Sequence, residues 1–414
     1  MKKTDVLIIG GGVTGLSLAS YLSKRDYLIL EKDSELGGYC KTEIRGDYVW
    51  DYSGHFFHFK NEEIKNYVLE NVECDLLKVE KITDIYYNHQ IIDFPFQHNI
   101  HQLNNVEYCE CLEDLKKCKE IDNSTFKSYV KSSLGAAICD KFVIPYNEKL
   151  YACNLDELES DSMGRFFPKM ISYNELQESK KSKSYNDTFI YPTGGSYEYI
   201  KSILKRVDES KIQLNTTILS IDYDTKIATT NSGEKIQFEN LVSTISFKNL
   251  LKLSNRKFDN LSSNKVAVFN LGFDKGTPIK THWRYFPGSE IFYRVGFYNN
   301  ILAHEKMSLY VEIGLSETQL IDESALLMQV LVDLEDSGII KDGVHELVTH
   351  QFLIMNPAYV HITKESKQLY NNWCLDYNKL GIYSIGRYGS WTYCSIEDNI
   401  VDAKNLANVL ENQK

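Results

Sequence analysis

A glycine-rich turn near the N-terminus joins two short apolar runs, and this arrangement restricts how the chain can begin to fold. The runs Val6–Ile9 and Tyr27–Leu30 are apolar along their length, as expected for strands buried on both faces. Between them, residues 10–15 read GGGVTG, and apolar residues from Leu16 to Leu22 recur at helical spacing. The pattern predicts a β-α-β unit whose first strand runs directly into the glycine turn.

The glycines match G-x-G-x-x-G, the fingerprint of dinucleotide-binding β-α-β units. Gly10 allows the tight turn, Gly12 lets the backbone approach a pyrophosphate, and Gly15 lets the helix pack closely on the strand. The pyrophosphate would bind the free N–H groups of the helix N-terminus. Glu31 follows the second run about 20 residues after the first glycine, where the fingerprint places an acid that binds ribose hydroxyls.

FAD and NAD enzymes share this fingerprint, and the residues that follow it distinguish the two cofactors. The segment from Glu31 to Gly38 resembles the E-x-x-x-x-x-G-G continuation of FAD-dependent oxidoreductases of the amine-oxidase type. The resemblance implies FAD as the cofactor, with Gly37 and Gly38 approaching its pyrophosphate a second time.

The rest of the chain alternates between strand-like and helical segments. Short apolar or alternating runs predict strands within residues 82–94, 212–245 and 266–313, and a last buried strand begins at Ile382. Charged sequence with leucines at helical spacing, from residue 111 to about residue 183, predicts an inserted helical region.

These segments predict an α/β fold with a discontinuous Rossmann-like FAD-binding domain, an antiparallel-sheet substrate domain and an inserted helical domain. The predicted FAD-binding domain comprises residues 1–75, 190–250 and 376–414, the substrate domain residues 76–97 and 251–375, and the insertion residues 98–189. The length of 414 residues is sufficient for two to three such domains.

Charge and cysteine content exclude several other classes of protein. The 46 Lys and Arg against 57 Asp and Glu give a net charge of −11, which argues against nucleic-acid partners and against a polybasic membrane-surface protein. The nine cysteines form no C-x-x-C pair and no zinc spacing, so we expect no metal site and a reduced, cytoplasmic protein. No apolar run approaches the ~18 residues of a membrane span.

Five further motifs point to one enzyme family. They are WDYSGHFFH at 50–58, DFPFQHN at 93–99, THWRYFP at 281–287 followed by FYR at 292–294, NPAY at 356–359, and GRYGSWTY at 386–393. Together they resemble motifs of the UDP-galactopyranose mutases, FAD enzymes that interconvert the pyranose and furanose forms of a nucleotide sugar. The resemblance covers nearly the whole chain, and the second and third motifs are closer to the eukaryotic branch of the family.

The resemblance implies which residues would bind the sugar nucleotide. Aromatic rings and an amide would hold the uracil, because rings stack on a base and an amide reads its edge. A guanidinium and tyrosine hydroxyls would hold the diphosphate. The implied residues are Phe94, Phe96 and Gln97 for the base, and Tyr285, Arg294, Tyr359 and Tyr393 for the diphosphate.

On the flavin side, the resemblance implies that His55 contacts the isoalloxazine and that Arg387 also contacts the flavin. Ser53 departs from the family pattern, because it replaces the first glycine of the loop that contains His55. Mutases have a second diphosphate-binding Arg in a region where this chain has Arg165 and Lys169, and the spacing favours Lys169. The implied catalytic residues are His55, Arg294 and Lys169.

The implied activity is that of an isomerase acting on a nucleotide sugar of the UDP-galactose type, through a covalent adduct between the sugar and N5 of reduced FAD. NAD(P)H or another reductant would first reduce the flavin. One alternative is an FAD-dependent oxidoreductase of the amine-oxidase or protoporphyrinogen-oxidase type, which shares the FAD motifs but does not require the uracil segment. A second is a protein that uses FAD structurally. The sequence is compatible with a homodimer and leaves the nucleotide and sugar open.

Overall fold

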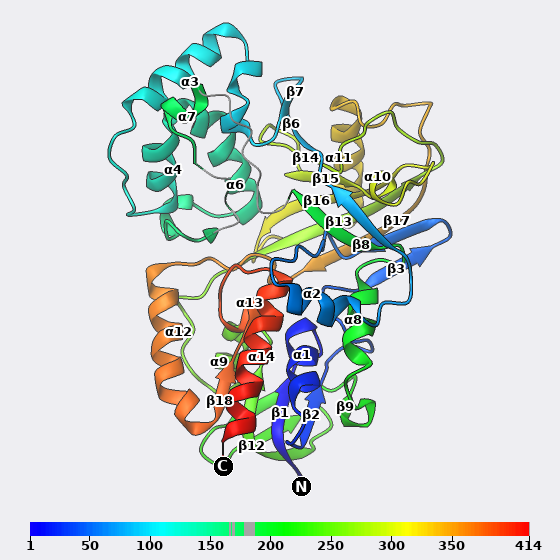
Figure 1. The fold of residues 1–414 in the computed structure, drawn as a ribbon, viewed down its shortest axis with the longest axis vertical. Helices are drawn as coiled ribbons and strands as arrows, with labels where there is room; N and C mark the ends of the chain where they lie inside the picture. The colour runs from blue at the N-terminus through cyan, green and yellow to red at the C-terminus, as the bar shows by residue number, and fades with distance from the viewer. Residues whose placement is uncertain (165–166, 168–169, 178–186, 414) are drawn as a thin grey trace.

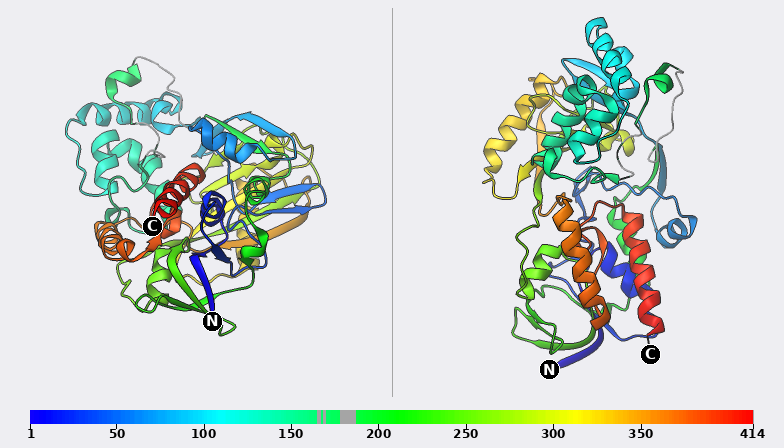
Figure 2. Two further views of the ribbon diagram at one scale, coloured as in Figure 1. Left: turned by 60° about the horizontal axis from the view of Figure 1, so that its bottom comes forward. Right: turned by 90° about the vertical axis from the view of Figure 1, so that its left-hand side faces the viewer.

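The structure is a computed structural model that describes residues 1–164, 167, 170–177 and 187–413. Figure 1 shows one sheet toward the end of the molecule that carries both termini, a second sheet toward the opposite end, and a group of helices beside the second sheet. The right-hand view of Figure 2 places the same helices (cyan) far from both termini. The fold is α/β, as the sequence predicts.

The first sheet gathers strands from distant parts of the chain around the N-terminal β-α-β unit. Its order is β10-β11-β12-β1-β2-β9, and β18 pairs with the carboxyl end of β12. The pairs that involve β1, β2, β9 and β18 are parallel, and those within β10-β11-β12 are antiparallel. The strands are β1 (Lys2–Ile9), β2 (Tyr27–Leu30), β9 (Ile212–Gln213), β10 (Ile218–Asp222), β11 (Ile227–Thr230), β12 (Lys235–Ser243) and β18 (Ile382–Ser384).

Helices cover both faces of this sheet, which explains why the second half of β1, Val6–Ile9, is apolar without alternation. Val6 and Ile8 pack in a cluster with α1, α2, α8 and α14, whereas Leu7 and Ile9 pack in another cluster with α9 and α12. The helices are α1 (Val13–Tyr21), α2 (Glu62–Leu69), α8 (Tyr197–Leu204), α9 (Phe247–Leu253), α12 (Lys364–Tyr377) and α14 (Ile396–Asn412).

The second sheet has the order β17-β13-β16-β15-β14-β6-β7. It is antiparallel, as predicted, except for the parallel pair of β14 with β6, a strand from a hairpin much earlier in the chain. Its strands are β6 (Thr83–Tyr87), β7 (Gln90–Asp93), β13 (Asn264–Phe273), β14 (Trp283–Tyr285), β15 (Arg294–Phe297), β16 (Ser308–Ser316) and β17 (Leu347–Met355). Two small sheets join β3 (Thr42–Arg45) to β4 (Tyr48–Asp51) and β5 (Leu76–Glu80) to β8 (Thr188–Pro192).

The helical group lies beside the second sheet in Figure 1 and packs on it through α6. It comprises α3 (Asn105–Lys117), α4 (Phe126–Leu134), α5 (Ala136–Ile138), a π-helix (Cys139–Val143), α6 (Ile144–Tyr151) and α7 (Tyr173–Gln177). Outside it, α10 (Tyr298–Ile301) and α11 (Glu323–Asp336) flank the second sheet. Within the described ranges, no helix is both long and apolar enough to cross a membrane.

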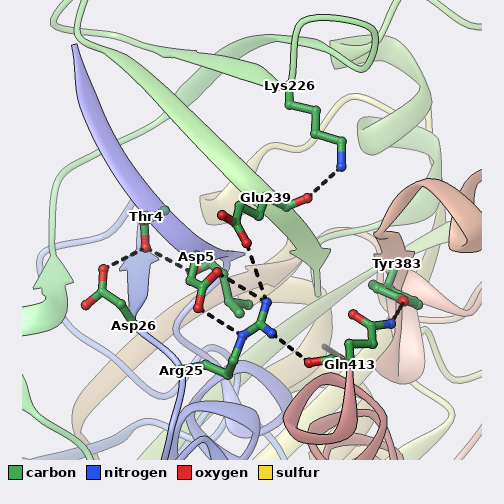
Figure 3. A network of polar contacts seen from close by, with 9 residues as sticks. Thr4, Asp5, Arg25, Asp26, Lys226, Glu239, Tyr383 and Gln413 are labelled. Atoms are coloured by element: carbon green, nitrogen blue, oxygen red, sulfur yellow. Dashed lines mark hydrogen bonds and ion pairs between the residues drawn. The ribbon is translucent and has the colours of Figure 1, made fainter.

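A polar network holds the end of the first sheet that carries the termini (Figure 3). The Arg25 guanidinium pairs with Asp5 on β1 at 2.9 Å and lies 3.8 Å from Glu239 on β12. Arg25 Nη1 also donates to the backbone oxygen of Gln413, after α14, at 3.4 Å. The network therefore ties the C-terminal helix to the two central strands, far from their carboxyl ends.

The buried carboxylate of Asp51, at the end of β4, joins several parts of the molecule. Its oxygens accept hydrogen bonds from Thr42 Oγ1 at 2.6 Å, Tyr191 Oη at 2.8 Å and the Ser196 backbone N–H at 2.9 Å. Asn270 Nδ2, on β13, donates to the Asp51 backbone oxygen at 2.9 Å. Burial raises the pKa of Asp51 to about 6, although the three donors favour its ionised form. The loop that follows Asp51 is thus held between the second sheet and the start of α8.

We predict that Asp51→Asn reduces the pH dependence of stability. The Asp51 carboxyl binds its proton more tightly in the folded protein, with a pKa of about 6, than in the unfolded chain, where the ordinary value is 3.8. The stability that this bound proton adds to the folded protein is therefore fully present below the ordinary pKa. It is lost as pH rises through the folded-state pKa, and the free energy of unfolding falls by about 3 kcal/mol. Urea unfolding of wild type and variant at pH values below and above this window measures the difference.

Asp47→Asn is the matched control, because Asp47 is an exposed acid on the turn before β4 that pairs with Lys306. We expect this control to keep the wild-type loss of stability between the two pH values. An Asp51→Asn variant that keeps the same loss would contradict the assigned effect of burial on the Asp51 pKa.

Candidate active site

A cavity of about 660 Å³ opens at the carboxyl ends of β1, β2 and β12 and extends to the second sheet. Gly10, Glu31 and Thr244 line the part next to the first sheet, and Arg294 and Glu312 line the part next to β15 and β16. Ligands of open parallel sheets bind at this edge, beyond the carboxyl ends of the strands. The cavity therefore lies where the glycine fingerprint predicts a dinucleotide.

Two glycine segments meet at the N-terminus of α1. Gly12 and Gly37 form a β-bridge, and the Gly37 N–H donates to the Gly11 oxygen at 2.8 Å. A Cβ on Gly15 would lie 2.0 Å from the Gly10 oxygen, so only glycine lets the helix approach β1 this closely. Gly12 is the N-cap residue of α1, and no described side chain accepts a cap hydrogen bond there. The first N–H groups of α1 are therefore left for a ligand in the cavity.

Glu31 lies at the end of β2 with its carboxylate fixed beside the glycine turn. Oε2 accepts a hydrogen bond from the Gly11 N–H at 2.7 Å, and Oε1 accepts one from the Asp33 N–H at 2.9 Å. Each oxygen keeps acceptor capacity beyond these contacts, and Glu31 lines the cavity. The glycine cradle and this acid together fit the pyrophosphate and ribose of a flavin dinucleotide.

His55 lies in the loop after β4 and lines the cavity. Its Nδ1 atom is buried and has no hydrogen-bond partner among the described residues. Burial lowers the pKa of His55 to about 4, with a further lowering from the nearby Arg387 charge, so the imidazole is neutral at physiological pH. A buried, unpartnered ring nitrogen fits a site in which a bound polar ring system completes the hydrogen bond.

Arg387 brings a positive charge into the cavity among tyrosines. Its guanidinium lies 4.5 Å from the ring centroid of Tyr393 and 5.3 Å from that of Tyr359, and these two rings stack at 5.7 Å. Nη1 donates to the Cys394 oxygen at 3.1 Å and Nη2 to the Ala358 oxygen at 3.4 Å. Within the described part of the chain, no acidic side chain forms an ion pair with Arg387. Its charge is thus available to an anionic ligand.

Arg294, the other predicted cation, is already paired. Its Nε and Nη2 atoms donate to both oxygens of Glu312, the latter at 2.8 Å, and the Glu312 side chain is only 1% exposed. Ser53 Oγ, from the loop that carries His55, also donates to Glu312. The structure therefore brings His55, Arg294, Arg387, Tyr359 and Tyr393 to one cavity, and it adds an anion that holds one edge of the Arg294 guanidinium.

The predicted base-binding segment lies away from the cavity lining. Phe96 is fully buried in the core, stacked on Phe142 of the π-helix at 5.3 Å, and Gln97 is only 2% exposed. Phe94 is half-buried and lies 5.0 Å, ring to ring, from Tyr285, which is also outside the lining. The fully buried Phe96 ring leaves no face for stacking a base in this structure.

Arg165 and Lys169, the two residues expected to provide a second cation for the diphosphate, both lie outside the described residues. Their expected role therefore stays a prediction.

Two residues that shape the site lie outside the motifs identified in the sequence. Glu312 could have been found, because it is the one acid in the otherwise apolar or small-residue strand SLYVEIGLS. Tyr146 on α6 gives no such signal, yet its ring lies 5.2 Å from that of Tyr285 and 6.0 Å from that of Tyr293. These contacts bring the helical group against the strands that carry Arg294.

Comparisons with known proteins agree with this geometry. A family model described as flavin containing amine oxidoreductase matches residues 13–390. A probable UDP-galactopyranose mutase of Klebsiella pneumoniae is 23% identical over 188 residues, which cover 42% of this chain and 48% of that protein. A corticosteroid-binding protein of Candida albicans is 24% identical over 258 residues, covering 58% and 49%. The chain thus spans about half the length of these curated relatives.

Solved structures share the fold over almost the entire chain. The crystal structure of reduced UDP-galactopyranose mutase superposes with a TM-score of 0.89 at 22% identity, covering 98% of this chain and 95% of that one. A putative protoporphyrinogen oxidase from Exiguobacterium gives 0.79 at 17% identity, covering 100% and 99%. Putrescine oxidase gives 0.67 at 13% identity, covering 99% of each chain. At these identities the likeness shows the fold.

We predict that Gly12→Val yields folded protein that binds FAD weakly. A Cβ on Gly12 meets nothing closer than the Gly38 Cα at 3.8 Å, so the fold tolerates it, but a branched side chain would fill the cradle in front of α1. FAD affinity should fall about a hundredfold, which corresponds to about 2.7 kcal/mol. Visible flavin absorbance per protein and titration of the apoprotein with FAD measure the loss.

Gly46→Asn serves as the control, because Gly46 lies in an exposed turn with φ +60°, where nothing lies within 4 Å of an added Cβ and Asn tolerates the conformation. It should retain wild-type flavin content. Full flavin content in Gly12→Val would show that the glycine turn is not the dinucleotide site.

Proposed function

Because this chain belongs to the family of flavin-containing amine oxidoreductases, we propose that it binds FAD and acts as an isomerase of the UDP-galactopyranose mutase type. Its substrate would be a nucleotide sugar, interconverted between pyranose and furanose forms. The enzyme would act with FAD reduced by NAD(P)H or another reductant. The superposition on reduced UDP-galactopyranose mutase supports this choice within the family.

The observation that carries the proposal is the charge of the cavity wall beside His55. Arg387 has no acidic partner among the described residues, and Arg294 keeps one guanidinium edge free of Glu312. Two guanidinium groups against one carboxylate favour an anion, and a diphosphate is the anion that a nucleotide sugar brings. The stacked Tyr359 and Tyr393 rings place hydroxyl-bearing side chains next to the same charge.

The roles of the chain's own residues follow from their positions. The N–H groups of α1 and the Glu31 carboxylate would hold the pyrophosphate and ribose of FAD. The neutral His55 imidazole would hydrogen-bond the flavin ring through Nδ1. When bound and reduced, FAD supplies the nucleophile for the anomeric carbon of the sugar. Arg294 and Arg387 would stabilise the negative charge that develops on the departing diphosphate.

Each of the three predicted parts of the chain would have its own role. We propose that residues 1–75, 190–250 and 376–414 bind FAD, that residues 76–97 and 251–375 bind the substrate through the second sheet, and that residues 98–189 cover the substrate. Ring contacts of Tyr146 with Tyr285 and Tyr293 support an association of the helical segment with the second sheet.

An oxidase of the amine-oxidase or protoporphyrinogen-oxidase type is the alternative within the same family. The fold likeness to a putative protoporphyrinogen oxidase favours it. Oxygen consumption with a polyamine or a porphyrinogen would identify such an activity, and a flavin that resists reduction by NADPH and dithionite would identify a structural role.

We predict that dithionite-reduced enzyme converts UDP-galactofuranose to UDP-galactopyranose, and that the oxidised enzyme does not. Reduction is required because only reduced flavin offers an electron pair to the sugar. Anaerobic incubation followed by chromatographic separation of the two isomers measures the conversion. The proposal fails if reduced, FAD-loaded enzyme converts neither this compound nor a related dTDP- or GDP-sugar.

A second prediction concerns the planar shape of the Arg294 guanidinium rather than its charge. Arg294→Lys keeps a positive charge but loses the planar group that contacts Glu312 and a phosphate together, so kcat/KM should fall about a hundredfold. Arg284→Lys is the control, because Arg284 forms a similar two-point pair with Asp84 outside the cavity lining. Equal losses in both variants would assign the effect to the sheet and not to the ligand.

A further inference from the structure

The pair between Arg294 and Glu312 restrains the guanidinium along one edge. The two residues are directly opposite each other on the antiparallel strands β15 and β16. Nε and Nη2 of Arg294 donate to the two oxygens of Glu312, and the carboxylate is 1% exposed. A two-point contact to a buried carboxylate fixes both the position and the plane of the guanidinium.

The second edge of the same guanidinium is left for a ligand. Nη1 of Arg294 has no hydrogen-bond partner among the residues that the structure describes, and Arg294 lines the cavity. Nη1 and the second proton of Nη2 together form a fork that matches two phosphate oxygens. The orientation of this fork depends on Glu312, because the contact on the first edge sets the plane.

Ser53 connects this pair to the loop that carries His55. Ser53 Oγ donates to Glu312 Oε1, the oxygen that also accepts from Arg294 Nη2. The backbone oxygen of Ser53 accepts hydrogen bonds from the His55 backbone N–H at 2.7 Å and from Tyr298 Oη at 3.3 Å. A displacement of Ser53 would therefore move both the acceptor of the guanidinium and the backbone of His55.

We propose that Glu312 and Ser53 are positioning residues, which present the free edge of Arg294 to the diphosphate of a nucleotide ligand and couple that orientation to the His55 loop. The identity of the ligand rests on the proposed function. The restraint on the guanidinium does not, because it follows from contacts within the chain.

The chain provides a matched pair outside the cavity. Arg284 and Asp84 are directly opposite each other on β14 and β6 of the same sheet, and Arg284 Nε and Nη2 contact the two carboxylate oxygens at 2.6 and 2.9 Å. Their side chains are 8% and 13% exposed, and neither lines the cavity. Asp84→Asn therefore removes a shielded two-point ion pair from the same sheet without touching the site.

The first test compares Glu312→Asp, Glu312→Gln and Asp84→Asn by calorimetric titration of FAD-loaded protein with UDP. Asp keeps the charge but is too short to contact both nitrogens, and Gln keeps the length but loses the charge. If Glu312 positions the guanidinium, both Glu312 variants should bind UDP about tenfold more weakly than wild type. The affinity of Asp84→Asn for UDP should stay within about twofold of wild type. If Glu312 acts only through its charge, Glu312→Gln binds UDP more tightly and Glu312→Asp is unchanged, which would overturn the proposal.

The second test needs no nucleotide. In protein labelled with 15N-arginine, the Nε–H signal of Arg294, assigned by its loss in Arg294→Lys, should be sharp and protected from exchange in wild type and in Asp84→Asn. It should broaden and lose protection in Glu312→Asp. An unchanged signal in that variant would refute the restraint. A wild type that binds no UDP but shows the expected signals would refute the proposed ligand and leave the restraint standing.

The third test addresses the coupling through Ser53. Ser53→Ala should weaken UDP binding about threefold, because it removes one of the donors to Glu312. In the Glu312→Asp background the same change should have no further effect, since the contact that Ser53 supports is already lost. Additive losses would show that Ser53 acts independently of Glu312 and would overturn the coupling.

Discussion

Asp51 is the residue on which the position of the loop beside the cavity depends, because its side chain and its backbone oxygen bond to four separate parts of the chain. Its side chain takes hydrogen bonds from β3, from β8 and from the residue before α8, and its backbone oxygen takes one from β13 of the second sheet. Two residues further on, Ser53 contacts Glu312, and His55 lines the cavity. The position of Asp51 thus sets the position of the loop that carries Ser53 and His55 into the cavity wall.

The charge of the cavity differs in sign from that of the whole chain. The protein carries a net charge of −11, yet the described residues around His55 contribute two guanidinium groups and one carboxylate. Charges in a partly desolvated wall act more strongly than the same charges on the surface, because the surrounding medium screens them less. An acidic chain can therefore present two sites suited to a diphosphate, one at the N–H groups that begin α1 and the other at the guanidinium groups.

The N-terminal β-α-β unit could be predicted because its signals are local. The strands, the glycine turn and Glu31 lie within about 30 residues, so their spacing determines the β-α-β unit. The pairing of Arg294 with Glu312 could not be predicted, because it requires the register of β15 against β16. The resemblance implies that Phe96 holds a base, whereas in this structure a short 3₁₀-helix begins at this residue and its ring packs on Phe142. This contact joins residues far apart in the sequence, so no local pattern predicts it.

The choice between isomerase and amine oxidase becomes a question of charge at this cavity. A polyamine is a cation, and a guanidinium about 4 Å from an ammonium group repels it by about 4 kcal/mol at an effective dielectric constant near 20. Glu312 could offset one such repulsion, but both its oxygens already bind Arg294. Arg387 has no acidic partner among the described residues, so its charge would act on the substrate with little compensation. The same two guanidinium groups attract a diphosphate. Within one family fold, the cavity beside His55 therefore favours an anionic substrate over an amine.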